Sequence, residues 1–220
     1  SAMDRVARTL SAEGALSAWR DERYEVRAHD GVPPAFLLER AAARYFGIRT
    51  RAVHVNGLVD TGTGAAMWIA RRSPTKAIDP GMLDNLVGGG IAAGATVAQT
   101  LAKEAWEEAG IDAATVSSAK PAGTIHVRRL QRDGLQHETI HVHDLWLPSE
   151  FVPANQDGEA VEHRRVALAT LPALLVHDEG PEALTADASL VALDALLRLG
   201  VIDADDPLHP WLAALCGQGR

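Results

Sequence analysis

A glycine-rich loop that runs directly into a capped acidic helix constrains this chain more than any other feature. The stretch 88–111 begins Gly-Gly-Gly and ends Glu-Glu-Ala-Gly-Ile. Thr96 and Gln99 have the spacing of a capping box, in which each side chain accepts a hydrogen bond from a free backbone amide, so the pattern predicts a helix from Val97. Gly110 can adopt a left-handed conformation and end that helix. The sequence therefore predicts a loop, a short helix and a sharp exit.

Three carboxylates converge on one side of this helix. Glu104, Glu107 and Glu108 stand at positions i, i+3 and i+4, where neighbouring like charges destabilise a helix. The last two also lie near the negative end of the helix dipole, at a cost of roughly 0.3–1 kcal/mol each, and only Lys103 offers local relief. A solvated acidic face is one interpretation. A bound divalent cation is the other, because Mg²⁺ requires hard oxygen ligands, and the flanking glycines favour it.

The same stretch resembles a Nudix box, whose family pattern is Gly-x5-Glu-x7-Arg-Glu-U-x-Glu-Glu-x-Gly-U, with U a bulky aliphatic residue. The positions that match are Gly89, Glu104, Glu107, Glu108, Gly110 and Ile111. Ala95 replaces the first Glu, Lys103 replaces the Arg and Ala105 fills the first U position. In the family the first Glu and the Arg support the loop and the helix through their charges.

The resemblance implies an α/β fold, the Nudix α/β/α sandwich with a mixed sheet, preceded here by a small N-terminal accessory module. It also implies a Nudix diphosphatase (a pyrophosphohydrolase) with Mg²⁺ or Mn²⁺ bound by Glu104, Glu107, Glu108 and the Gly89 carbonyl. Nudix enzymes often bring a further acid from a distal loop, and Glu159 is the expected general base, with Glu104 as its rival. A polar turn is the structural alternative for Glu159.

Segments 67–76, 80–89 and 151–159 are similar to a narrower Nudix branch related to thiamine metabolism, which in fungi can be fused to thiamine pyrophosphokinase. Members of that branch commonly lack the first Glu of the box and carry Lys for Arg. The resemblance implies hydrolysis of thiamine diphosphate, or of its oxidised or deaminated analogues, to the monophosphate. Two alternatives remain: a hydrolase of ADP-ribose or another nucleoside diphosphate derivative, and a catalytically silent Nudix fold that binds a ligand and regulates a partner.

A small basic cluster precedes the box. Arg71, Arg72 and Lys76 are candidates for substrate phosphate binding, since Arg offers a two-pronged donor and Lys a point charge. Ordinary surface charge is the alternative. Isopentenyl diphosphate isomerases also resemble Nudix proteins, but they use a cysteine ahead of the box. The only cysteine here, Cys216, lies far beyond it, which excludes that reading.

The expected organisation is an accessory module over 1–48, a Nudix domain over 49–205 and a C-terminal helix and tail over 206–220. Within the module the spacing of apolar residues predicts a helix over 35–46. The other expected elements are strands at 52–59, 67–71, 122–130 and 139–147, and helices at 171–176, 186–199 and 210–215.

Composition limits the partners. A formal net charge of −8 argues against a nucleic-acid ligand, since contacts to a phosphate backbone require basic surface. No apolar run reaches the ~18 residues of a membrane helix, and the single cysteine suits a reducing compartment. We therefore expect a cytoplasmic protein that acts on a small-molecule diphosphate, without nucleic-acid or membrane partners and with a homodimer as one possible assembly.

Overall fold

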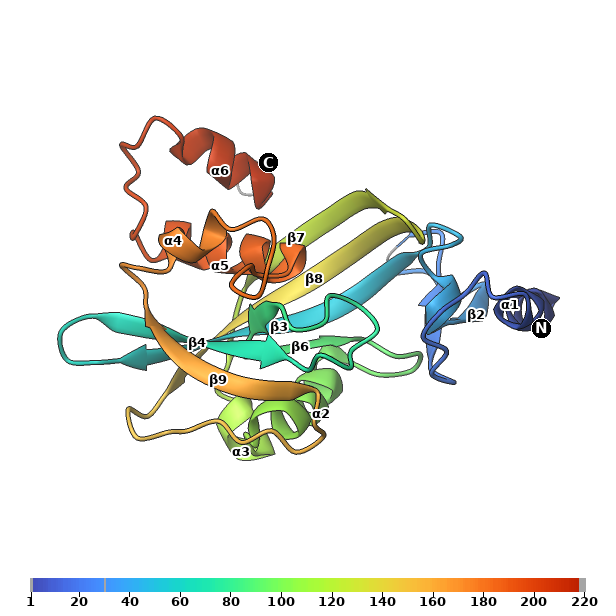
Figure 1. Cartoon of the computed structure of the whole chain (residues 1–220), viewed down its shortest axis with the longest axis horizontal. Helices are drawn as coiled ribbons and strands as arrows, with labels where there is room; N and C mark the ends of the chain where they lie inside the picture. Colours follow the sequence, from blue (N-terminus) through green and yellow to red (C-terminus); the bar gives the residue numbers. More distant parts are fainter. Residues whose placement is uncertain (1, 30, 218–220) are drawn as a thin grey trace.

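A computed structural model describes residues 2–29 and 31–217, so the end of the expected C-terminal tail lies outside the described part. The chain contains both helices and strands, many of them in consecutive runs of one type (Figure 1). The helices are α1 (Ala2–Ala12), the 3₁₀ helix η1 (Arg40–Ala42), α2 (Val97–Ala109), α3 (Ala113–Val116), α4 (Pro172–Leu175), α5 (Ala186–Arg198) and α6 (His209–Leu215). The strands are β1 (Arg23–Val26), β2 (Phe36–Glu39), β3 (Arg49–Asp60), β4 (Ala65–Arg72), β5 (Leu83–Asn85), β6 (Val87–Gly90), β7 (Lys120–Gln131), β8 (Gly134–Leu147) and β9 (Ala160–Ala167).

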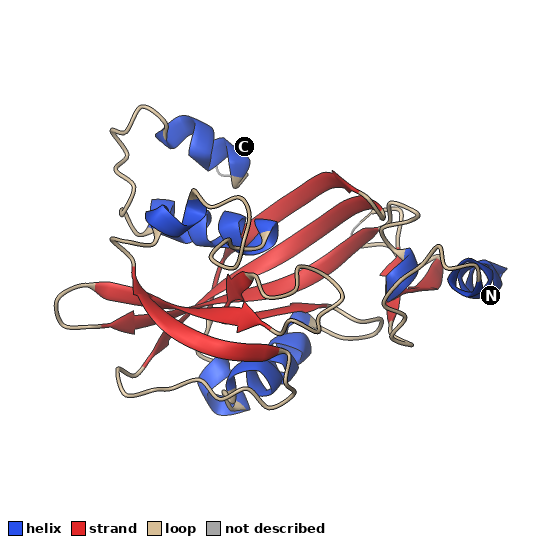
Figure 2. Cartoon of the chain, in the orientation of Figure 1, coloured by secondary structure: helices blue, strands red, loops and turns tan. Residues whose placement is uncertain are grey.

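A seven-stranded mixed sheet is organised around β3 (Figure 2). Strand β3 runs parallel to β8 along its whole length and antiparallel to two shorter partners, β6 at its beginning and β4 at its end. Strand β7 forms a hairpin with β8, while β5 and β9 both pair with β4. The glycine loop of the sequence thus starts as β6, which places it directly beside the central strand.

Helices cover both faces of this sheet (Figure 1). On one face, Leu101, Ala105 and Ala109 of α2 pack on buried β3 and β8 residues such as Val53 and Leu145. On the other face, α5 packs on β3, β4 and β5, and the buried residues of that cluster are Leu58, Met67, Ile69, Leu83, Leu168, Leu171, Leu184, Ala188, Ala192, Ala195 and Leu196. The expected α/β/α sandwich with a mixed sheet is confirmed.

The N-terminal segment lies at one end of the large sheet and contains α1 and the two-stranded sheet β1–β2 (Figure 1). The predicted helix over 35–46 is wrong: Phe36–Glu39 forms a strand, and only the short η1 follows it. Pairing with β1 explains the difference, because an extended backbone buries Leu38, 1% exposed, while Leu37 stays 37% exposed. Tertiary pairing overrides the local helical spacing.

The expected strands and the later helices are present, with ends shifted by a few residues. None of the helices in the described part of the chain has the length and apolar character needed to cross a bilayer.

Candidate active site

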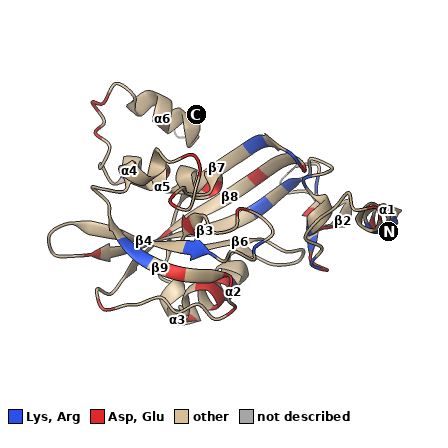
Figure 3. Ribbon diagram, in the orientation of Figure 1, with Lys and Arg blue, Asp and Glu red and all other residues tan. Residues whose placement is uncertain are grey.

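Helix α2 begins and ends with the capping interactions that the sequence predicts. Gln99 donates its backbone N–H to the Thr96 hydroxyl at 3.2 Å, and Thr96 donates its own to the Gln99 amide oxygen at 2.9 Å. Gly110 ends the helix with a φ of 66°. The apolar side of α2 is buried against the sheet. Acidic residues colour part of α2 red in the charge-coloured ribbon (Figure 3).

Glu104 lies directly against the backbone of Gly89. A Cβ atom added at Gly89 would stand 2.5 Å from the Glu104 Cγ and 2.8 Å from its Oε1, closer than atoms can approach. The Glu104 side chain is only 14% exposed. Burial raises its pKa above the usual value, although the hydrogen bond from Lys103 opposes this shift. Glycine at position 89 therefore makes room for a carboxylate.

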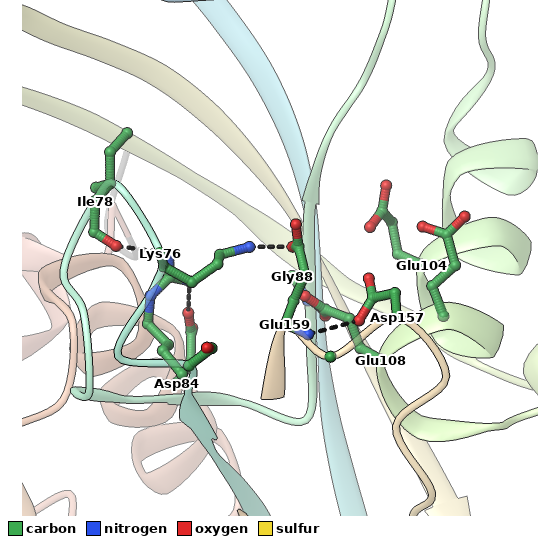
Figure 4. Close-up of polar contacts among 12 residues, drawn as sticks. Lys76, Ile78, Asp84, Gly88, Glu104, Glu108, Asp157 and Glu159 are labelled. Atoms are coloured by element: carbon green, nitrogen blue, oxygen red, sulfur yellow. Dashed lines mark hydrogen bonds and ion pairs between the residues drawn. The ribbon is translucent and has the colours of Figure 1, made fainter. Parts of the chain in front are cut away.

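Glu108 is bound to the neighbouring glycine. The Gly88 N–H donates to the Glu108 Oε2 at 2.7 Å (Figure 4). Burial raises the pKa of Glu108 well above its usual value, repulsion from Asp84 and Glu104 adds to the rise, and the Gly88 N–H counteracts it. Two carboxylates one helical turn apart are thus held against two successive residues of β6.

Lys103 joins the first two carboxylates of the trio. Its ammonium lies 3.0 Å from the Glu104 Oε1 and 2.6 Å from the Glu107 Oε2. Burial lowers the pKa of Lys103, but the hydrogen bonds to Glu107 and Glu104 outweigh that effect, and the net shift is upward. One cation shared by two carboxylates is an arrangement that a divalent ion can also satisfy.

The chemistry of these donors fits Mg²⁺ or Mn²⁺, because all are carboxylate oxygens, and glycine at position 89 lets one of them lie against the strand backbone. Across residues 2–29 and 31–217, however, no three His, Cys, Asp or Glu side chains are gathered into a metal-binding group. The Lys103 ammonium, placed between Glu104 and Glu107, occupies part of the position where such a group would close.

Glu159 reaches the site from the loop before β9 and is held by two cations. Lys76 forms an ion pair with its Oε2 (Figure 4). The Arg20 Nη1 lies 3.2 Å from its Oε1. Burial raises the pKa of Glu159, but the bonds to Lys76 and Arg20 prevail and the net shift is downward. The structure therefore brings the distal acid together with one predicted phosphate ligand.

The other two basic candidates differ. Arg72 pairs with Asp84 at 2.6 Å and lines a cavity beside β6 together with Lys76. Arg71 instead pairs with Glu162 at 2.7 Å and with Glu182 at 2.8 Å. Position beside the glycine strand therefore favours Arg72 and Lys76 over Arg71 as phosphate ligands.

A groove and a cavity adjoin each other beside α2 and β6. A groove contains the carboxylates of Glu104, Glu107 and Glu159, and a cavity of about 180 Å³ lies over Gly88, Gly89 and Gly90. Arg20 and Arg40 of the N-terminal segment line both.

Sequence reasoning missed these two arginines, and it missed Tyr24, whose ring lies against Gly90. A Cβ atom added at Gly90 would stand 2.9 Å from the Tyr24 Cζ. The run of three glycines beside β3 was the available signal, since each needs a close neighbour to explain it.

Comparison with known proteins agrees with this geometry. The NUDIX domain family matches residues 49–205, and a domain of unknown function (DUF4743) matches residues 1–50. The chain is 35% identical over 206 residues to Nudix hydrolase 24, chloroplastic, of Arabidopsis thaliana, covering 94% of this chain and 56% of the relative. It is 36% identical over 197 residues to Nudix hydrolase 20, chloroplastic, of the same plant, covering 90% and 52%. The chain thus spans about half the length of these curated relatives.

Solved structures agree on the fold. A crystal structure from Deinococcus radiodurans superimposes with a TM-score of 0.57 at 25% identity, covering 77% of this chain and 97% of the other. The NUDIX domain of Shewanella oneidensis NrtR, solved with ADP ribose, gives a TM-score of 0.53 at 13% identity and covers 69% and 88%. With a family match over most of its length, a Nudix-like sandwich and the acidic helix docked on a glycine strand, the chain belongs to the Nudix family.

Proposed function

We propose that this protein is a metal-dependent diphosphatase, and that thiamine diphosphate or its oxidised or deaminated analogues are its substrates, cleaved to the monophosphate. The observation that carries the diphosphatase assignment is the pair of carboxylates, Glu104 and Glu108, held against Gly89 and Gly88. The substrate assignment is supported by the resemblance of segments 67–76, 80–89 and 151–159 to the thiamine-related branch.

Each side chain has a role in this proposal. A Mg²⁺ or Mn²⁺ ion on Glu104, Glu107, Glu108 and the Gly89 carbonyl would neutralise diphosphate oxygens and lower the pKa of a water molecule. Lys76 and Arg20, which face the same region through Glu159, neutralise charge on the departing phosphate. Gly88 fixes Glu108 through its N–H, so that carboxylate needs no rearrangement before the reaction.

Glu104 is a stronger candidate than Glu159 for the general base. The Glu159 carboxylate is engaged by Lys76 and Arg20, and accepting a proton would cost both ion pairs. Glu104 is bonded to one partner, the exposed Lys103, and faces the groove. Glu159 then orients the two cations that meet the phosphates.

Replacing Glu108 by Gln tests the assignment. The amide is nearly isosteric and can still accept from the Gly88 N–H, so we expect a folded protein that has lost Mg²⁺-dependent phosphate release. Turnover should be screened on thiamine diphosphate, its oxidised and deaminated analogues and ADP-ribose. Glu150→Gln is the matched control, because Glu150 is exposed and bonds only Ser149 in the described structure. An unchanged rate in the Glu108 variant refutes the site.

The screen also separates the alternatives. Cleavage of ADP-ribose alone, to AMP and ribose 5-phosphate, would replace the thiamine assignment while keeping the diphosphatase. Tight binding of one of these compounds without turnover, at any Mg²⁺ or Mn²⁺ concentration, would identify a silent ligand-binding protein, as the departures at Ala95 and Lys103 allow.

A further inference from the structure

One face of the large sheet lines the cavity beside the glycine strand β6. Gly88 and Gly90 of β6 pair with His54 and Ala52 of β3, so these four residues share one face of the sheet. Parallel pairing brings Glu138 of β8 beside Thr50 on the same face. The Tyr24 ring lies over Gly90 and the His54 ring over Gly88, so two rings of the protein border the cavity on this face.

One end of this cavity is acidic. Glu138 lines it from β8 and Asp187 from the first turn of α5. Gln136, which is only 3% exposed, donates its amide to both oxygens of Asp187, at 2.8 and 3.0 Å, and Thr50 donates to Glu138 at 2.9 Å. Within the described residues, neither carboxylate forms an ion pair with Lys or Arg. These two acids therefore keep acceptor capacity without a neutralising charge.

Burial makes the two neighbouring carboxylates, Asp187 and Glu138, unfavourable when both are charged. It raises the pKa of Asp187, and repulsion from Glu138 raises it further, against the opposing effects of His54 and Gln136. A positively charged or amino-bearing group in the cavity would relieve that repulsion and use the vacant lone pairs.

Basic side chains also line the cavity. Arg72, Lys76, Arg20 and Arg40 line it, and the two N-terminal arginines continue into the groove of Glu104 and Glu159. From β6, beside the catalytic helix, to β8, which carries Glu138, is two strand spacings, or about 10 Å. The cavity therefore offers cations next to the carboxylate groove and two carboxylates that no Lys or Arg of the described residues neutralises.

We propose that this cavity binds the organic half of the substrate, and that this half is a cationic or amino-bearing heterocycle that Asp187 and Glu138 recognise. The inference rests on the proposed diphosphatase function and specifies its substrate class. It also gives the N-terminal segment a role, since Tyr24, Arg20 and Arg40 form one wall of the cavity. That segment is then a part of the substrate site.

Binding of a phosphate-free ring tests the proposal without turnover. Thiamine, a cationic aminopyrimidine compound, should bind the metal-free full chain in calorimetry. The isosteric substitutions Asp187→Asn and Glu138→Gln should each weaken this binding roughly 10-fold or more, as for loss of a hydrogen bond to a charged group. Glu179→Gln, on an exposed loop, is the matched control and should bind like the unmodified protein.

Turnover distinguishes this inference from the proposed function. The same two substitutions should raise KM for thiamine diphosphate and leave KM for methyl diphosphate, which has no ring, unchanged. If the unmodified protein hydrolyses neither these two compounds nor the oxidised and deaminated analogues, the proposed function fails, while the calorimetry still decides the cavity. Absence of thiamine binding, or equal binding in the acid-to-amide variants, overturns the cavity assignment. Circular dichroism of each variant confirms that the sheet and helices are retained.

Discussion

Replacing Gly89 by Ala perturbs the contact on which the site depends. The added methyl carbon would stand 2.5 Å from the Glu104 Cγ and 2.8 Å from its Oε1, well inside the normal separation of about 3.5–4.0 Å between carbon atoms. The neighbouring atoms belong to a side chain, so Glu104 can rotate away without unfolding the protein. We expect the carboxylate to leave its place and phosphate release to fall by at least 10-fold.

The size of the effect on stability follows from the same geometry. Inserting one methyl group into a packed site costs typically 1–3 kcal/mol. If the Glu104 side chain is the obstacle, that cost should disappear once the side chain is removed. In the Glu104→Ala background, Gly89→Ala should therefore be nearly neutral, which gives a coupling free energy of about 1–3 kcal/mol between the two positions.

Urea unfolding of the four proteins in this cycle, with EDTA present, measures the coupling directly. Gly89 has an ordinary backbone conformation, unlike Gly110 with its φ of 66°, so backbone strain does not confuse the result. Equal destabilisation by Gly89→Ala in both backgrounds would show that Glu104 does not lie against Gly89. The proposed position of the carboxylates beside β6 would then be refuted.

Two smaller perturbations test the helix itself. Thr96→Ala removes the hydroxyl that accepts from Gln99 and should lower the free energy of unfolding by about 0.5–2 kcal/mol, measured as a shift of the urea midpoint at constant m-value; an unchanged midpoint contradicts the capping role. Lys103→Met removes the cation between Glu104 and Glu107, so Mn²⁺ titrations at low salt should show tighter binding, with a smaller gain at 0.5 M salt because of screening. Weaker Mn²⁺ binding would instead show that Lys103 supports the ligand geometry.

The parts of the fold that the sequence predicts are those encoded by neighbours along the chain. The ends of α2 follow from Thr96, Gln99 and Gly110, because caps act within one turn. The β7–β8 hairpin follows from alternating residues around Asp133–Gly134. The error at 35–46 has a different cause: the apolar pattern suits a helix locally, and pairing with the preceding strand β1 makes the extended form favourable.

The candidate site divides in the same way. Glu104, Glu107 and Glu108 are visible as a spacing, whereas their neighbours across the molecule are not. Arg20 lies 139 residues from Glu159, its ion-pair partner, and no local pattern marks it. Asp187 is an ordinary first-turn acid of α5 by sequence. Only the packing of α5 on the sheet, where the Gln136 amide of β8 bonds both acids, brings it near Glu138.

The N-terminal segment contacts the loop of the Nudix box at the position where the family pattern is altered. Where the family pattern has a Glu, this chain has Ala95, which packs against the apolar core under α2. A carboxylate still supports the loop, because Glu25 of β1 accepts from the Gly94 N–H at 3.3 Å and lies 3.5 Å from Arg51 of β3.

A backbone bond from the Ala93 N–H to the Arg23 carbonyl, at 2.7 Å, ties the same two segments together. Support that the family pattern places inside the box is thus supplied by β1. Ala95 alone therefore does not indicate a decayed site, because an acid on the N-terminal segment, which also carries Arg20 and Tyr24, supports the loop where the first Glu of the box is lost.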